Sequence, residues 1–359
     1  MNTAFSQTRF VPGLMALVAA AGLANRAHAV AIPVAAGWTG GVFDTGGLLN
    51  PAANGGFTLG GLEVDPAGGR VYVVGANVGV GLTSSSLRML SSTGLGTAVL
   101  DASGVAPLSY ATRGTDLTYN AGSYYVAASR VGGAPGIYGF TPGGGQPVYA
   151  AGGGIPSWAT SGLTFNAAGT MARVTSDLGT GHHSVLAGAV ASTLLVGQGA
   201  VPGGYGAGAD DHVVTPGGRV LVAEDIGRGI YDITGGPGAV ALFANPNILG
   251  GPGFAGPGVG SRITVHPVSG DLFLAWGDSG DRIIRVAADG LSVETIATGF
   301  SRGVRDIDWG LDGTGTLCLF ATEVSTTGIG TIYSFKIPAP GTGTLLALGG
   351  FCMARRRRR

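Results

Sequence analysis

The stretch that decides the fold is residues 261–287, SRITVHPVSGDLFLAWGDSGDRIIRVA. Ile263 and Val265 alternate with polar neighbours, which is typical of a half-buried strand. Residues 267–270 (PVSG) have turn chemistry, because proline fixes φ and glycine reaches positive φ. The apolar run 272–276, the polar turn 277–281 and the run 282–286 follow. This order predicts three antiparallel strands joined by two tight turns.

The same unit recurs along the chain at intervals of 44 to 55 residues. Each copy begins with an apolar residue at the head of its first strand: Leu62, Leu117, Leu163, Val213, Ile263 and Ile307. A strand-built period of about 40–50 residues is the signature of a propeller blade of four strands. Most copies add a fourth apolar run, but the last copy lacks it. We therefore expect an all-β, six-bladed β-propeller over residues 30–336, in which an N-terminal strand, Val30 to Val42, completes the last blade and removes the exposed sheet edges.

Two stretches, 220–233 and 272–287, resemble the NHL-type propeller blade, in which an apolar strand, an acidic residue and a polar turn precede an Arg-Ile-like strand. The matching residues are Asp225, Arg228 and Ile230, and Asp278, Arg282 and Ile283. The resemblance implies a propeller and no particular function, because a fold does not determine what a protein does.

The composition fits many short strands joined by turns. The 359 residues include 70 glycines without a Gly-X-Y period, which excludes collagen, and the 45% apolar content excludes a disordered chain. Arg9, Arg26 and the five C-terminal arginines account for seven of the 20 basic residues, so the body between them has a net charge of −7 against 20 acidic residues. An acidic body argues against nucleic acid as a partner. Cys318 and Cys352 are the two cysteines, and we expect no disulfide between them.

Residues 1–29 have the pattern of a signal peptide. A polar start with Arg9 precedes an apolar run from Val11 to Ala24, and Ala27-His28-Ala29 is an A-x-A cleavage signature. The apolar run is too short to span a membrane. The sequence therefore predicts export, and the alternative is an N-terminal helix of the fold.

Residues 337–359 carry the most specific signal in the chain. Pro338, Ala339 and Pro340 precede an apolar segment from Gly341 to Ala354, and the chain closes with five arginines, Arg355, Arg356, Arg357, Arg358 and Arg359. This arrangement resembles the PEP-CTERM sorting signals of bacteria, although Ala339 stands where the motif of that family has glutamate. The resemblance implies a short hydrophobic helix, transient anchoring in the inner membrane, cleavage near the prolines by an exosortase, and delivery to the cell surface or extracellular matrix.

The physical properties of this tail agree with a membrane role. As a helix, the apolar segment would be about 21 Å long, which is less than the ~30 Å hydrocarbon core of a bilayer. The arginines would hold its end in the cytoplasm. A permanent C-terminal anchor is the alternative.

Candidate site residues gather at the heads of the inner strands, which converge on the central channel of a propeller. They are Glu63, Asp116, Asp211, His212, Arg262, Arg305 and Asp306. The four carboxylates among them could hold Ca²⁺ through oxygen ligands. By analogy, six-bladed lactonases and phosphotriesterases use a Glu, Asn and Asp set there, but asparagine is missing from these heads and glycine takes two of them, Gly61 and Gly162. A channel lined by water and structural ion pairs is the alternative.

No motif for a nucleophile or a zinc site is present, since the sequence lacks G-x-S-x-G, H-E-x-x-H and paired C-x-x-C. His182 and His183 are adjacent, so on a strand they face opposite ways. The sequence thus predicts a non-catalytic surface or matrix protein without a cofactor, which binds exopolysaccharide or another protein through its rim loops. The alternatives are a Ca²⁺-dependent lactonase-like or esterase-like hydrolase and a purely structural coat component.

Overall fold

The computed structural model describes sixteen segments of the chain, at residues 34–49, 57–77, 87–103, 116–128, 136–143, 148–151, 160–166, 168–176, 181–186, 193–197, 209–224, 229–249, 262–276, 281–300, 303–324 and 330–337. The predicted signal peptide and, apart from Ile337, the predicted sorting tail lie outside these residues. Three residues of the stretches that resemble an NHL blade, Asp225, Arg228 and Asp278, are also outside the described residues. Within the described residues, no helix is both long enough and apolar enough to cross a bilayer.

The strands of the described residues pair into six four-stranded antiparallel sheets. Sheet one has β2 (Phe57–Val64), β3 (Val71–Asn77), β4 (Leu87–Ser92) and β5 (Val99–Ser103). Sheet two has β6 (Leu117–Asn120), β7 (Ser123–Ala128), β8 (Gly136–Phe140) and β9 (Val148–Ala151). Sheet three has β10 (Thr160–Phe165), β11 (Met171–Ser176), β12 (Gly181–Leu186) and β13 (Thr193–Gly197).

The remaining sheets follow the same order, except that the last takes its outer strand from the N-terminal part of the chain. Sheet four has β14 (Ala209–Val214), β15 (Val220–Glu224), β16 (Gly229–Asp232) and β17 (Ala241–Ala244). Sheet five has β18 (Ile263–Val265), β19 (Leu272–Trp276), β20 (Arg282–Val286) and β21 (Val293–Thr298). Sheet six has β22 (Val304–Leu311), β23 (Leu317–Val324), β24 (Gly330–Lys336) and β1 (Thr39–Thr45). Two short 3₁₀ helices, η1 (Gly47–Leu49) and η3 (Pro237–Ala239), lie in connections.

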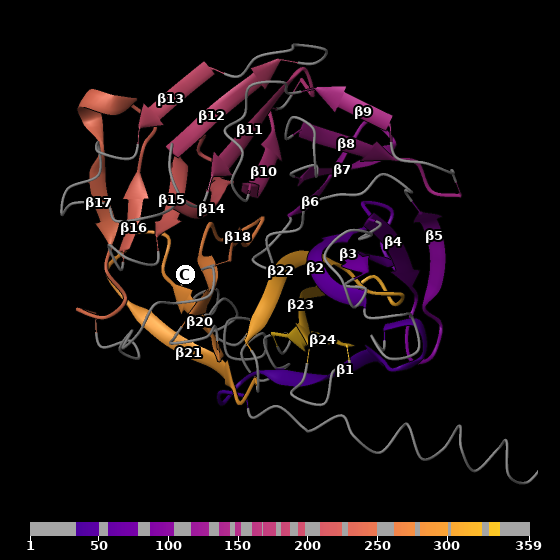
Figure 1. The fold of residues 1–359 in the computed structure, drawn as a ribbon. Coiled ribbons are helices and arrows are strands. Elements are labelled where there is room, and N and C mark those ends of the chain that lie inside the picture. Colours follow the sequence, from indigo (N-terminus) through magenta and orange to yellow (C-terminus); the bar gives the residue numbers. More distant parts are fainter. Residues whose placement is uncertain are drawn as a thin grey trace, which may run out of the picture. The chain divides into compact units, whose positions relative to one another are not determined.

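The first strands of the sheets form a closed ring. Each inner strand contacts the next in the order β2, β6, β10, β14, β18 and β22, and β22 returns to β2. The sheets radiate from this centre, with their fourth strands outermost (Figure 1). The predicted all-β propeller fold is therefore confirmed.

The strand predicted over residues 30–42 starts later than expected. Val34 makes an isolated bridge to Ala297 of sheet five. Gly37, with a φ of +85°, then turns the chain into β1, whose Thr39 lies opposite Lys336 of β24. Within the described part of the predicted strand, Val34 and Ala35 therefore contact sheet five, while residues from Thr39 onward complete sheet six.

The core lies between neighbouring sheets. One apolar cluster joins sheets five and six around Phe273, Trp309 and Phe335, and another joins sheets six and one around Phe320 and Leu62. Trp276 is fully buried between sheets four and five. Burial of these large apolar side chains is the main favourable term that holds adjacent sheets face to face.

Asp44 of β1 links sheet six to sheet one through hydrogen bonds. Its side chain is fully buried and accepts hydrogen bonds from the Ser92 hydroxyl at 2.5 Å and from the Gly96 and Thr45 N–H groups at 2.6 and 2.8 Å. Ser92 is the last residue of β4, and Gly96 lies in the turn between β4 and β5. The N-terminal strand is thus bonded to a second sheet as well as to β24.

Candidate functional site

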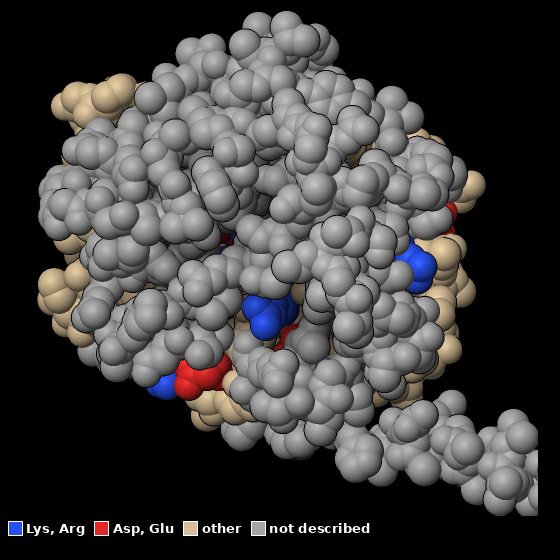
Figure 2. Space-filling model, in the orientation of Figure 1, with Lys and Arg blue, Asp and Glu red and all other residues tan. Residues whose placement is uncertain are grey.

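The polar residues at the heads of the inner strands line one cavity. It has a volume of about 140 Å³ and is bounded by residues of the inner strands of every sheet. Acidic and basic atoms are both visible near the middle of the face in view (Figure 2). The polar members of the lining are Glu63, Asp116, Thr118, Thr164, Asp211, His212, Asp306 and Asp308.

Three aspartates in this cavity each bond the backbone of two sheets. Asp306 accepts the N–H of Ile307 in its own strand at 2.8 Å and the N–H of Leu62 in β2 at 2.6 Å. A carboxylate that accepts two N–H groups has both oxygens committed, and these donors are buried, so they would otherwise lack partners.

The other two aspartates make the same arrangement. Asp211 accepts the N–H groups of His212 at 2.7 Å and of Ile263 in β18 at 3.0 Å. Asp116 accepts the N–H of Leu117 and, at 2.8 Å, the N–H of Leu163 in β10. The bridging aspartates therefore occur on every second inner strand around the ring.

The remaining pairs of neighbouring sheets are joined by other side chains from the same level. Glu63 of β2 accepts the N–H of Tyr119 in β6. The imidazole Nε2 of His212 lies 2.7 Å from the Thr164 hydroxyl of β10. Arg262 donates from Nε to the backbone carbonyl of Arg305 at 3.1 Å. Every adjacent pair of inner strands is thus joined by a polar side chain at the channel.

The structure corrects the predicted alignment of the fourth repeat by one residue. The ladders skip a residue just before Asp306 in β22 and just before Asp211 in β14, so these two aspartates are equivalent. His212 then occupies the position of Ile307, and Val213 follows it. The error arose because the repeats were aligned on an apolar head residue. In the fourth repeat the head position is occupied by the polar residue His212, so the alignment moved one residue on to Val213.

Asp308, which lies two residues after Asp306 in β22, was not among the predicted site residues. Its carboxylate accepts the N–H of Trp309 at 2.7 Å and the N–H of Val64 in β2 at 3.0 Å. It also accepts a hydrogen bond from the Thr264 side chain of β18. The Asp-x-Asp spacing could have revealed it, since residues two apart on a strand point to the same side.

Burial changes the protonation of these carboxyl groups. It raises the pKa of Asp116 to about 6 and that of Asp308 to about 7, and it raises the pKa of Glu63, Asp211 and Asp306 well above the ordinary range. The negative charge of Asp116 also contributes to the raised pKa of Asp306.

Arg262 supplies positive charge to this acidic channel. Its side chain is 2% exposed, and its charge lowers the pKa of Asp116, Asp211 and Asp306 against the effect of burial. Arg305 contributes its backbone carbonyl to the link with Arg262, and its side chain is only partly buried. The channel contacts of Arg262, Asp306 and Asp211 join side chains to backbone groups, and the predicted ion pair of Arg305 with a neighbouring acid stays a prediction.

Among the residues that the structure describes, no three His, Cys, Asp or Glu side chains are arranged to hold a metal ion. The channel carboxylates direct their oxygens at backbone N–H groups, so a Ca²⁺ ion would have to compete with those bonds. His182 and His183 lie in β12 as adjacent strand residues.

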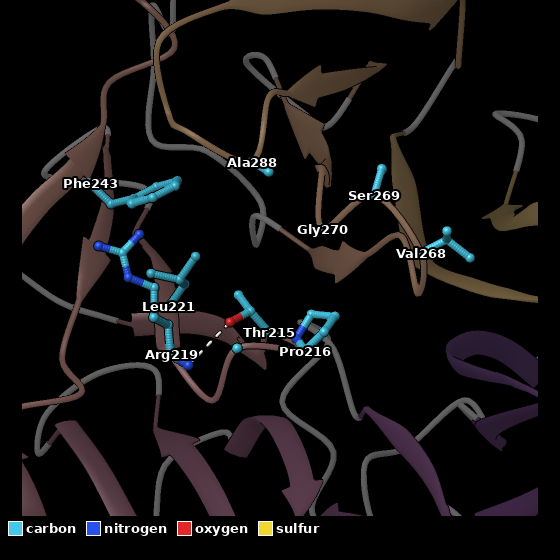
Figure 3. Close-up of a pocket in the computed structure, with 10 residues that line it drawn as sticks. Thr215, Pro216, Arg219, Leu221, Phe243, Val268, Ser269, Gly270 and Ala288 are labelled. Carbon is cyan, nitrogen blue, oxygen red and sulfur yellow. Dashed lines mark hydrogen bonds between the residues drawn. The ribbon is translucent and has the colours of Figure 1, made fainter.

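A second hollow lies between sheets four and five, beside the turns that follow their inner strands. Its volume is about 250 Å³, and its lining includes Pro216, Phe243, Val268 and Ser269 (Figure 3). The Arg219 guanidinium lies 5.2 Å from the centre of the Phe243 ring and is paired with Asp232 at 3.1 Å. The polar groups of this cleft are therefore already engaged within the protein.

Comparison with known proteins adds support at the level of the fold. No protein family model matches the chain, and no curated protein matches it. Among solved structures, a structural genomics protein of unknown function from Bacteroides thetaiotaomicron VPI-5482 aligns at 10% identity with a TM-score of 0.53, covering 85% of this chain and 72% of that protein.

Two matches are to domains named as β-propellers. The Cps50 (Swd1) domain of Myceliophteria thermophila aligns at 13% identity with a TM-score of 0.42, over 77% of this chain and 83% of the domain. The WD40 domain of Doa1 aligns at 14% identity with a TM-score of 0.42, over 77% of this chain and 93% of the domain. At these identities a likeness concerns the fold alone, and TM-scores below 0.5 add no argument to the topology described above.

Proposed function

We propose that this chain is an exported, non-catalytic propeller that is presented at the cell surface or in the extracellular matrix and binds a polysaccharide or another protein. The observation that carries this proposal is the engagement of the channel carboxylates. Asp116, Asp211 and Asp306 each accept two backbone N–H groups from adjacent sheets. Groups that hold the ring together in this way are poorly placed to act as a general base or as open metal ligands.

The binding surface in this proposal is the rim at which the inner strands begin. The connections between second and third strands, and those from one sheet to the next, start and finish at that rim. Many of them are long and rich in glycine in the sequence, such as residues 247–261. Loops carried on a rigid scaffold are where binding residues concentrate.

Export and sorting complete the proposal. Residues 1–29 would be removed after Ala29, and an exosortase-type enzyme would cleave near Pro338, Ala339 and Pro340 while residues 341–354 sit transiently in the inner membrane. The support is the order of these features in the sequence, together with the position of β24, which ends at Lys336 just before the proline motif.

The sorting step is tested by the mass of the protein recovered from the surface fraction of a host that carries an exosortase. We expect a chain that has lost the five terminal arginines. A matched variant in which Pro338 and Pro340 are both replaced by alanine should keep them. Recovery of intact wild-type chain from the same fraction would contradict the proposal.

The binding step is tested on a glycan array and in pull-downs of surface proteins. We expect a signal that persists in a chelator, because the proposed ligand contacts loops and not a metal. An Asp211→Asn variant that remains folded should bind as the wild type does, since its carboxylate bonds the backbone. A signal that chelation abolishes would contradict this reading.

The second candidate is a Ca²⁺-dependent lactonase-like or esterase-like hydrolase. It is favoured by one observation, the gathering of five carboxyl groups around a cavity of about 140 Å³ at the channel. In that case Glu63, Asp116, Asp211 and Asp306 would be the first ligands to test. Chelator-sensitive hydrolysis of a lactone or ester, lost on substitution of any of these residues, would favour this candidate over the binding protein.

A further inference from the structure

One face of the propeller is defined by the turns between the first and second strands of the sheets, and we call it the turn face. Its described turns include residues 65–70, 215–219, 266–271 and 312–316. These turns lie beside one another. Gly69 donates to the carbonyl of Leu311 at 2.8 Å, and the rings of His266 and Trp309 are 4.6 Å apart. The inner strands begin at the opposite rim, and the acidic cavity lies along these strands between that rim and the turn face.

The chain leaves the described fold at the turn face. β24 ends at Lys336, whose Nζ atom lies 2.5 Å from Oδ2 of Asp312, in the turn after β22. Hydrogen bonds from Thr314 and Thr316 also hold the Asp312 carboxylate, so this anchor is fixed to the turn. Ile337 follows directly and is 47% exposed.

The distance from this exit to the apolar tail is short. This step rests on the proposed function, in which residues 341–354 sit in the membrane. Four residue steps separate Ile337 from Gly341, and an extended chain covers at most about 3.6 Å per step, or about 14 Å in all. The headgroup layer on each side of the hydrocarbon core is about 5–7 Å thick. An inserted tail therefore holds the turn face close to the headgroup layer.

The exposed residues of the turn face suit that position. Val268 is 85% exposed in the turn of sheet five, and Leu311 is 40% exposed at the end of β22. Leu291 is 74% exposed in the turn between β20 and β21, beside the cleft that Phe243 and Ala288 line. Exposed large apolar side chains that gather on one face mark an interaction surface.

Three basic groups near this face have acidic partners. Lys336 pairs with Asp312, Arg219 with Asp232, and Arg285 with Asp271 at 2.7 Å. Asp65 and Asp289 add negative charge in turns of the same face, so contact with a bilayer would depend on apolar area and not on attraction to anionic lipid.

We propose that the turn face is a membrane-apposed surface, and that Val268 and Leu311 contact the lipid headgroup region while the tail is inserted. This arrangement directs the opposite rim, with its long connections, away from the membrane. It also places the proline motif between the folded body and the lipid, where a membrane-embedded sorting enzyme would reach it.

The test uses the full chain in liposomes of phosphatidylethanolamine and phosphatidylglycerol, with and without a lipid that carries a bromine quencher near its headgroup. In a Cys352→Ser background, whose remaining Cys318 is fully buried, single cysteines are labelled with a small fluorophore. Val268→Cys reports on the turn face and Leu346→Cys reports on the tail. Ile248→Cys is the control, because Ile248 is 77% exposed in the turn that follows β17, at the opposite rim.

We expect several-fold stronger quenching at position 268 than at position 248, together with quenching at position 346. Quenching at 346 with equal values at 268 and 248 would overturn the proposal while leaving the membrane tail intact. Absence of quenching at both 346 and 268 would refute the membrane tail and the proposal with it. Quenching at 268 without quenching at 346 would support the turn face as a lipid-binding surface and count against insertion of the tail.

Discussion

Asp306 gives the sharpest test of how the propeller ring is held. Its carboxylate accepts the N–H of Leu62 at 2.6 Å and the N–H of Ile307 at 2.8 Å, and all three residues are at most 3% exposed. Leaving a buried N–H group without an acceptor costs about 1–3 kcal/mol. Asp306→Asn keeps one acceptor oxygen, so it should lower the free energy of unfolding by about 1–3 kcal/mol. Asp306→Ala loses both and should cost roughly 2–6 kcal/mol.

The assay is urea-induced unfolding followed by tryptophan fluorescence, with the free energy extrapolated to water. Asp289→Asn is the matched control, because Asp289 is an exposed turn residue that caps the N–H of Leu291 at 2.9 Å. We expect the control to change the free energy of unfolding by less than about 1 kcal/mol. Equal stabilities of the wild type, Asp306→Asn and Asp306→Ala would refute the bridging role of this carboxylate.

Three further predictions follow from packing, from the closing strand and from protonation. A Cβ atom at Gly310 would lie 2.2–2.9 Å from side-chain atoms of Val64, so Gly310→Ala should lower the thermal midpoint of unfolding, and adding Val64→Ala should partly restore it. Gly313→Ala is the control and should have little effect, because no atom lies within 4 Å of the new Cβ. Asp44→Ala should destabilise the protein by about 2–5 kcal/mol, because three donors lose their buried acceptor. Proteolysis of the N-terminal strand should also accelerate, and an unchanged rate would contradict the role of Asp44 in holding β1 to sheet one. Burial raises the pKa of Asp116 from 3.8 to about 6, so the unfolded chain releases this proton first as the pH rises. The free energy of unfolding should therefore fall between about pH 4 and pH 6, by on the order of 3 kcal/mol from this group. A thermal midpoint that rises over this range would contradict the raised pKa of Asp116.

The sequence was sufficient for the fold because the fold depends on local patterns. Alternation around Ile263 and the PVSG turn predict a strand pair, and recurrence every 44 to 55 residues predicts a propeller. The start of β1 was placed too early, since nothing in the sequence distinguishes the apolar residue Val34, which bridges to sheet five, from the strand that begins at Thr39.

The candidate site could be predicted only in part. The head residues were found because they precede apolar residues, but their partners could not be, since Asp306 and Leu62 are 244 residues apart and meet only when the ring closes. The ladder irregularities next to Asp211 and Asp306 lie between the first and second strands of their own sheets. Carboxylates that bridge backbones and carboxylates that bind a cation therefore look the same in the sequence.

Calcium titration by isothermal calorimetry tests the central claim most directly, which is that the channel carboxylates hold the ring together and do not form a metal site. The wild-type protein is compared with Asp116→Asn and Asp306→Asn, each first shown to be folded. The bridging account predicts no stoichiometric heat of binding in any of the three. One-to-one binding of Ca²⁺ by the wild type that both variants lose would contradict it and would make the hydrolase the leading function.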